Sequence, residues 1–221
     1  MKIKFPLLLT SILITSYCLL GQSSSDSIFL KPTKYIDSDN SKIINKAKEL
    51  TSICTSDNHK LKAIFEFVRD THSDTIFESH KASEILELGG NSCHQRSILF
   101  AALCRTIGMP ARLHWQKAER HDYRFNDGTV KNLVFIHGIV GVKVNNNWHL
   151  YEPVGNNAKW HVWVQKNEIN TLTYRDEQDC LLQDTDKITF KTLPIYFSDY
   201  FVEMEILKEK IDVDEISFIT N

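Results

Sequence analysis

The segment Gly89–Arg112 reads GGNSCHQRSILFAALCRTIGMPAR and predicts a loop, a sharply started helix and an exit into a strand. Two glycines open it, and Ser92 precedes Gln95 by three residues, which is the spacing of a capping box. Apolar side chains then recur at helical intervals until GMP at 108–110 stops the helix. Cys93 is therefore expected to be the first helical residue. Free amides and the helix dipole stabilise an anion there, so we expect a lowered thiol pKa and an available nucleophile.

The composition is that of an ordinary folded protein. The 221 residues are 42% hydrophobic and 24% charged, with a formal net charge of -2. This size allows one domain with a substantial core, and the charge balance gives no reason to expect a nucleic-acid partner or a polybasic membrane patch. There is no CxxC pair for a zinc or dithiol site and no acidic loop of the calcium-binding type, so we expect no metal and no cofactor.

The N-terminus predicts export. A short basic start precedes the apolar run PLLLTSILITSYCLLG at 6–21, and polar residues follow, which is the pattern of a signal peptide covering residues 1–21. An uncleaved membrane anchor and lipid attachment at Cys18 are alternatives, although bulky Tyr17 precedes that cysteine. The product would be periplasmic, secreted or lipid-anchored at the cell envelope, and the oligomeric state is not indicated.

The rest of the chain predicts an α+β domain over residues 41–221, after an extended linker at 22–40. Helical spacing of apolar residues predicts helices beginning at Ser41 and Asp57 and a short helix near Ala82. The strand candidates are 75–77, 111–115, 133–144, 148–154 and 160–164. Residues 121–132 predict a polar loop with a turn at 127–128, and a second turn is expected at 145–147. A last helix is expected near 196–207.

A base and an orienting acid for Cys93 can be found downstream. His137 lies in a β-rich run, and Glu152 follows fifteen residues later, after a tight turn and a partner strand. Because antiparallel strands bring such positions side by side, Glu152 could hold one nitrogen of the imidazole while the other nitrogen faces the thiol. These residues predict a Cys93–His137–Glu152 triad.

The motifs resemble the transglutaminase-like superfamily over residues 42–155. The matching pieces are GGNSC (89–93), RTIGMPAR (105–112), HGIVGVKV (137–144) and WHLYEPV (148–154). The resemblance implies a papain-like α+β fold in which the cysteine helix packs on an antiparallel sheet. It also implies that Cys93 is the nucleophile, His137 the base and acid, and Glu152 the third residue. Two departures are visible, because the family's third residue is usually Asp and an aromatic residue usually follows the histidine, where this chain has Gly138 and Ile139.

The remaining candidates surround this triad or belong to the core. Asn91 is a candidate oxyanion donor beside the Cys93 amide, with Ser92 and Gln95 behind the nucleophile. His94 is expected to point elsewhere on the helix, as a surface or supporting residue. Cys104 is expected to be a core residue, and Arg112 is expected to form an ion pair at the helix-to-strand corner. Cys54 and Cys180 could form a disulfide, which the sequence does not decide. His114, His149 and His161 lack the spacing of metal ligands, so we expect core or surface roles for them, and the four tryptophans are expected to pack the core or hairpins.

Together these observations predict an exported cysteine acyl-transfer enzyme acting on amide bonds of a protein or peptide. The reaction would pass through a thioester at Cys93, and hydrolysis by a peptidase or amidase is favoured over cross-linking because no dedicated lysine site is evident. The alternative is a binding module at the cell surface or in the periplasm that keeps the fold without turnover, which the Glu152 departure motivates.

Overall fold

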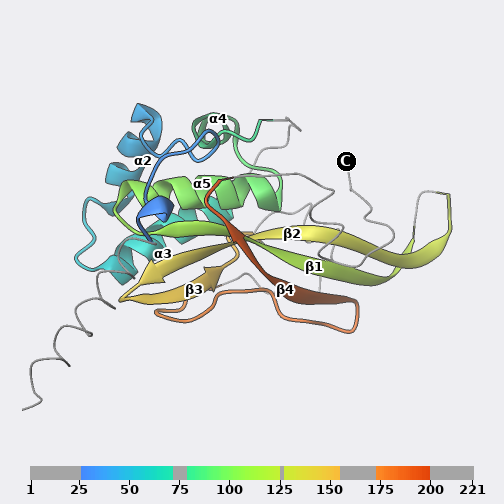
Figure 1. The fold of residues 1–221 in the computed structure, drawn as a ribbon. Helices are drawn as coiled ribbons and strands as arrows, with labels where there is room; N and C mark the ends of the chain where they lie inside the picture. Colours follow the sequence, from blue (N-terminus) through green and yellow to red (C-terminus); the bar gives the residue numbers. More distant parts are fainter. Residues whose placement is uncertain (1–25, 72–78, 125–126, 155–172, 200–221) are drawn as a thin grey trace, which may run out of the picture.

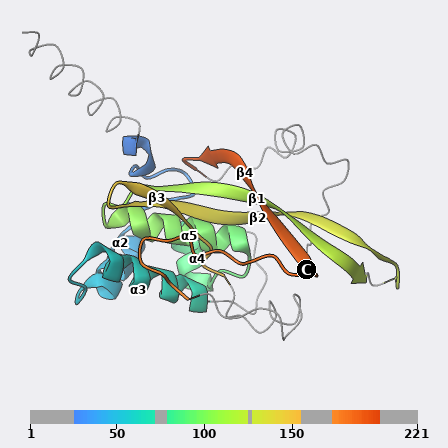
Figure 2. The same ribbon diagram turned by 90° about the horizontal axis from the view of Figure 1, so that it is seen from below.

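The computed structural model describes residues 26–71, 79–124, 127–154 and 173–199. Its α-helices lie together on one face of an antiparallel sheet, as the two ribbon views show (Figures 1 and 2). The helical elements are the short 3-10 turn η1 (Ser27–Phe29), α2 (Ser41–Thr51), α3 (Asp57–Asp70), α4 (Ala82–Leu88) and α5 (Cys93–Thr106). The strands are β1 (Ala111–Arg124), β2 (Val130–Val144), β3 (Asn147–Tyr151) and β4 (Ile188–Phe197).

The helices begin where the sequence places capping residues. The side chains of Asn40, Ser56 and Ser92 accept hydrogen bonds from first-turn amides of α2, α3 and α5. The apolar stripe of α3 (Leu61, Ile64, Phe65 and Val68) is fully buried. The predicted starts of these helices are therefore confirmed, and so is the short helix at Ala82.

Helix α5 is the centre of the fold. It contacts α2, α3 and α4 on one side and β1 and β2 on the other. Every residue from Gln95 to Arg105 is buried, so the helix has no solvent-facing side over these residues. Because α5 is fixed between two layers, the position of its first residue, Cys93, is set by the whole fold.

The sheet has the strand order β3-β2-β1-β4, and all neighbouring strands are antiparallel. The turn between β2 and β3 places Asn145 and Asn146 at φ 47° and 69°, which suits a tight hairpin turn. Strand β3 pairs with β2 only from Val140 to Val144. The edge of β2 before Val140 is therefore not covered by β3, and this is where His137 and Gly138 lie.

Three expectations about the secondary structure were wrong. Residues 26–40 are not a free extended linker, because they form η1 and bury Phe29 and Ile36. The polar stretch 121–132 is not a loop excursion, because β1 continues to Arg124 and β2 begins at Val130. The last helix was expected to begin near Tyr196, but that residue lies in β4, a strand that was not predicted.

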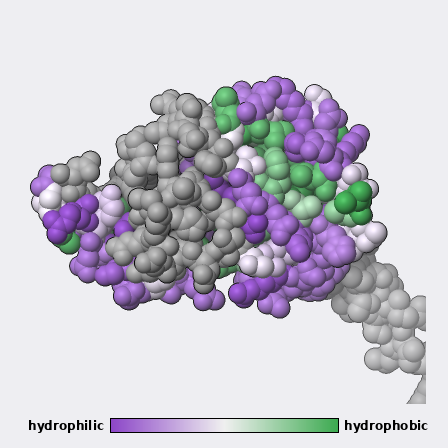
Figure 3. Space-filling view, turned by 180° about the vertical axis from the view of Figure 1, so that it is seen from behind, coloured by the Kyte–Doolittle hydropathy of each residue, from purple (hydrophilic) through white to green (hydrophobic). Residues whose placement is uncertain are grey.

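Several expectations fall outside the described residues: the signal peptide at 1–21, the strands at 75–77 and 160–164, and the rest of the last helix. Within the described ranges, no helix combines the length and apolar composition needed to cross a bilayer. Viewed from behind, the described surface is mostly hydrophilic, with one area of hydrophobic residues (Figure 3). Cys104 is fully buried, as expected, and Cys54 and Cys180 are free thiols that do not pair.

Candidate active site

The nucleophile candidate stands at the start of α5, as the capping pattern predicts. The Ser92 hydroxyl accepts the Gln95 amide at 3.2 Å, and the Gln95 side-chain oxygen accepts the backbone amides of Asn91 and Ser92 at 3.1 and 3.3 Å. This capping box fixes the turn that carries Cys93. The predicted supporting residues Ser92 and Gln95 therefore hold the backbone under the thiol rather than contacting a substrate.

His137 and Glu152 meet on the other side of the thiol. The His137 Nε2 atom lies 2.5 Å from a carboxylate oxygen of Glu152, and neither side chain is exposed to solvent. The second carboxylate oxygen accepts the backbone amide of Leu182 at 2.7 Å. Glu152 is placed there because β3 ends at Tyr151, opposite Val140, so the next residue reaches past the strand end toward His137.

The structure brings Cys93 to the same point. The backbone N–H of Gly138 donates to the Cys93 sulfur at 3.4 Å, across the part of the β2 edge that β3 leaves uncovered. The imidazole of His137 also interacts with the thiol. The three residues of the predicted triad are therefore neighbours, although they come from the start of α5, the middle of β2 and the end of β3.

The electrostatics of this group favour a thiolate–imidazolium pair. Burial alone raises the pKa of the Cys93 thiol, but charge interactions and hydrogen bonds with His94 and His137 outweigh it and hold that pKa well below its ordinary value. Burial alone lowers the pKa of His137, but the Glu152 carboxylate and the Cys93 thiolate raise it to about 10. Between these two pKa values, the thiol is ionised and the imidazole is protonated.

His94 belongs to this site, contrary to the expectation that it points elsewhere. Its ring meets Trp115 edge to face, with 4.7 Å between centroids and 90° between planes. A Cβ atom added at Gly138 would lie only 2.7 Å from the His94 ring. The imidazole thus occupies the space beside Gly138, and the absence of a side chain there is what lets α5 approach β2 this closely.

Other expected residues lie away from the thiol. Arg112 does not form the predicted ion pair in the described part of the chain. Its guanidinium lies between the rings of Trp148 and Tyr196, 3.9 Å from each centroid, and donates to His114 at 3.0 Å. Burial and the Arg112 charge lower the pKa of His114 to about 4, so this imidazole is neutral near pH 7.

No group of three or more metal-ligating side chains is found among the described residues. His149 lies in β3. His161, Trp160 and Trp163 are outside the described part of the chain. The role of Asn91 as an oxyanion donor stays a prediction.

A comparison with protein families decides the relationship. The model of the transglutaminase-like superfamily matches residues 44–167, more than half of the 221 residues. The chain belongs to the transglutaminase-like superfamily. The matched range contains Cys93, His137 and Glu152. Membership in this superfamily supports a cysteine-based enzyme, and the α+β, papain/transglutaminase-like fold class is confirmed.

A solved structure also resembles this superfamily member. It is described as a “putative cysteine protease” from Cytophaga hutchinsonii and is 20% identical, with a TM-score of 0.44. The match covers 57% of this chain and 40% of that chain. No curated protein matches this superfamily member.

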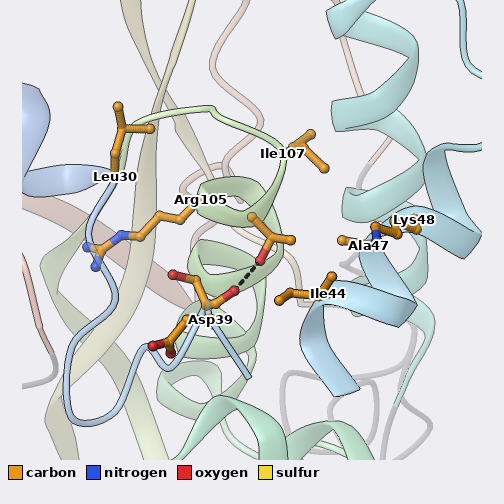
Figure 4. A pocket seen from close by; sticks show the side chains of 9 residues that line it. Leu30, Asp39, Ile44, Ala47, Lys48, Arg105 and Ile107 are labelled. Carbon is orange, nitrogen blue, oxygen red and sulfur yellow. Dashed lines mark hydrogen bonds between the residues drawn. The ribbon is translucent and has the colours of Figure 1, made fainter. Parts of the chain in front are cut away.

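A cavity of about 350 Å³ lies at the opposite end of α5, about 20 Å from Cys93 at 1.5 Å per helical residue. In Figure 4 the guanidinium of Arg105 points toward the segment of Leu30, while Ile44, Ala47 and Lys48 project from α2. Arg105 donates to the carbonyl oxygens of Lys31, Ala111 and Ser198. The Arg105 guanidinium therefore stabilises the fold through these backbone hydrogen bonds, and the cavity lies far from the Cys93 thiol.

Proposed function

We propose that the protein is an exported cysteine acyl-transfer enzyme that acts on amide bonds of a protein or peptide through Cys93, His137 and Glu152. The observation that carries the proposal is the buried 2.5 Å contact between His137 and Glu152 next to a thiol at a helix start. This arrangement supplies a nucleophile, a proton carrier and an orienting carboxylate in contact with one another. No cofactor is required for this chemistry.

In the proposed reaction, the Cys93 thiolate attacks the amide carbonyl and forms a C–S bond. The tetrahedral oxyanion would be held by the Cys93 amide and a second donor, for which Asn91 is the candidate. When the C–N bond breaks, protonated His137 gives its proton to the leaving amine. Neutral His137 then takes a proton from water as water attacks the thioester, and the thiolate leaves.

Glu152 is long enough for the third role. One carboxylate oxygen contacts His137, and the other accepts the amide of Leu182, so the side chain is held at both oxygens. The replacement of the family's usual Asp therefore does not by itself argue for an inactive binding module. We favour water over an amine as the acceptor because nothing in the described residues marks a lysine-binding site.

The first experiment measures the reactivity of Cys93 with iodoacetamide as a function of pH. The mature protein is compared with the His137→Ala and Glu152→Ala variants, and Cys93→Ala defines the background from other cysteines. An apparent thiol pKa well below the free value of about 8.5 that rises in His137→Ala supports the enzyme. A thiol that reacts only at alkaline pH, or ignores His137, contradicts it and favours the binding module.

A second experiment separates the two acyl acceptors. A peptide mixture is incubated with the protein in the presence and absence of a biotin-labelled primary amine, and the products are identified by mass spectrometry. New peptide termini or deamidated side chains indicate hydrolysis, whereas biotin on the peptides indicates transamidation. Cys93→Ala is the control for both readouts, and activity that survives in this variant argues against Cys93 as the nucleophile.

Export is proposed from the first 21 residues, because a basic start, an apolar run and polar residues follow one another there. N-terminal sequencing of the protein from its own cells tests this. A terminus near Gln22 supports cleavage after Gly21, a lipid-modified Cys18 supports an anchored form, and an intact Met1 contradicts export by cleavage.

A further inference from the structure

His94 is fixed beside the nucleophile by two strands. Its ring stands edge to face on Trp115 of β1, with centroids 4.7 Å apart. On β2, an added Cβ at Gly138 would lie 2.7 Å from the His94 ring and 3.4 Å from the His94 Cα atom. The imidazole therefore fills a space bounded by both strands, and it cannot swing toward the sheet without displacing them.

The charges that face the Cys93 thiol come from several elements. His94 and Arg96 are on α5 itself, and His137 is on β2. The Arg96 side chain is buried and donates to the carbonyl oxygens of Gly90 and Arg69, so it also holds the loop before the nucleophile. The carboxylates interact with these basic side chains rather than with the thiol. Glu152 is bound to His137, and the Asp70 carboxylate acts on Arg96.

Both imidazoles interact with the thiol, and both lower the thiol pKa. Their surroundings differ. His137 is aligned by a carboxylate at 2.5 Å, which suits a group that gains and loses a proton. His94 instead packs against an indole ring and a glycine backbone, which fix its position.

We propose that Cys93 has two imidazole partners with separate roles. His94 stabilises the thiolate, and His137 transfers the proton. This proposal rests on the proposed acyl-transfer function and names a further residue of that site. During acylation the thiolate electron pair forms the C–S bond, the proton of His137 goes to the leaving amine, and His94 takes no part in the proton transfer. When water attacks and the C–S bond breaks, the electron pair returns to sulfur beside the His94 imidazole, which stays packed against Trp115.

The need for a second partner follows from the reaction cycle. His137 is neutral in the thioester state because its proton has left with the amine. His137 regains a positive charge only as water attacks, because it takes the proton of that water. A thiolate that depended on His137 alone would therefore be stabilised only in step with that proton transfer. His94 is therefore expected to stabilise the departing thiolate during deacylation as well as the resting thiolate.

The test compares the pH dependence of Cys93 alkylation in four variants: His94→Phe, His94→Gln, His137→Gln and His121→Gln. His94→Phe keeps a ring against Trp115 but has no ring nitrogen to interact with the thiolate, so it separates the polar effect from packing. His121 lies on β1 with its side chain 34% exposed and serves as the matched histidine control. Near-ultraviolet circular dichroism, which reports on the environment of Trp115, confirms that each variant is folded.

We expect both His94 variants to raise the apparent thiol pKa by about one unit, which lowers the alkylation rate below that pKa about tenfold. Turnover should persist in them and shift to higher pH, with the deacylation step slowed. His137→Gln should lose turnover but keep a thiol more acidic than a free cysteine. An unchanged thiol pKa in both His94 variants, or a free-thiol pKa in His137→Gln, overturns the proposal.

The outcomes also separate this proposal from the proposed function. If the wild-type thiol is acidic and depends on His137 alone, the acyl-transfer function stands and the role of His94 fails. If the wild-type thiol has an ordinary pKa and neither histidine affects it, the acyl-transfer function itself fails.

Discussion

The close approach of α5 to β2 at Gly138 can be tested by adding one methyl group. In Gly138→Ala the new Cβ would lie 2.7 Å from the His94 ring, 3.2 Å from the Trp115 ring and 3.4 Å from the His94 Cα atom. Real Cβ atoms do not approach other atoms to 2.7 Å, so the imidazole or the start of α5 must move. Both are packed on several sides. We therefore expect a loss of about 1–3 kcal/mol in the free energy of unfolding, the usual cost of overpacking a core.

The same movement should disturb the thiol. The Gly138 amide donates to the Cys93 sulfur at 3.4 Å, and a shift of α5 lengthens this contact. Displacement of His94 also weakens an interaction that lowers the thiol pKa. At pH values below the thiol pKa, alkylation of Cys93 should slow about tenfold, which corresponds to about one pKa unit. Urea unfolding measures the stability loss, and iodoacetamide kinetics measure the thiol.

Gly141→Ala is the matched control on the same strand. Its added Cβ would lie 2.8 Å from His114 Nε2, and Gly141 faces the opposite side of the sheet from Gly138. It imposes a comparable clash with an imidazole but leaves the Cys93 side unchanged. If Gly138→Ala is alkylated as fast as Gly141→Ala, the close approach at Gly138 does not set the reactivity of Cys93, and this reasoning is refuted.

Four further predictions follow from the same geometry. Glu152→Gln leaves a buried imidazolium without its carboxylate, so thermal unfolding should show a loss of about 3–5 kcal/mol; a loss below 1 kcal/mol contradicts the buried pair. Turnover should rise with pH as the acidic Cys93 thiol ionises and fall near pH 10 as His137 loses its proton, and a profile without the upper limb argues against His137 as proton donor. Cys104 is fully buried and its thiol pKa is raised, so mass mapping should find it unlabelled in the native protein and labelled only after denaturation. Ser92→Ala removes the cap of α5 and should cost about 0.5–2 kcal/mol in urea unfolding, with no effect expected only if the capping bond does not form.

The parts of the fold that the sequence predicts are those with local causes. A serine three residues before a glutamine specifies where α5 begins, because the two hydrogen bonds of the capping box lie within one turn. The stripe of α3 and the asparagine turn after β2 are local in the same way. The meeting of His137 and Glu152 could also be predicted, because a hairpin fixes which residues lie opposite each other.

The errors have non-local causes. Strands β1 and β2 extend past α5 into a hairpin whose residues are partly exposed on both faces, so the alternation of apolar and polar residues is lost there. Strand β4 is an edge strand that pairs only with β1 and contains Pro194, which weakens its strand pattern. His94 was assigned to another side of the helix because successive helical residues are about 100° apart. The start of α5 meets both β1 and β2, however, so two consecutive residues face the sheet.

Because α5 is buried, the site needs several basic side chains to stabilise the Cys93 thiolate. A thiolate at the start of a buried helix loses much of its hydration, and this cost must be offset by nearby positive groups.

A related feature is not revealed by the periodicity of the sequence, because α5 carries a buried arginine near each end. Arg96 ties the helix start to the carbonyl oxygens of Gly90 and Arg69, and Arg105 ties the helix end to those of Lys31, Ala111 and Ser198. Each arginine uses its charge to bind backbone that would otherwise be free to move, and Arg96 also faces the thiolate. The same buried helix thus supplies the rigidity that fixes Cys93 and part of the charge that ionises it.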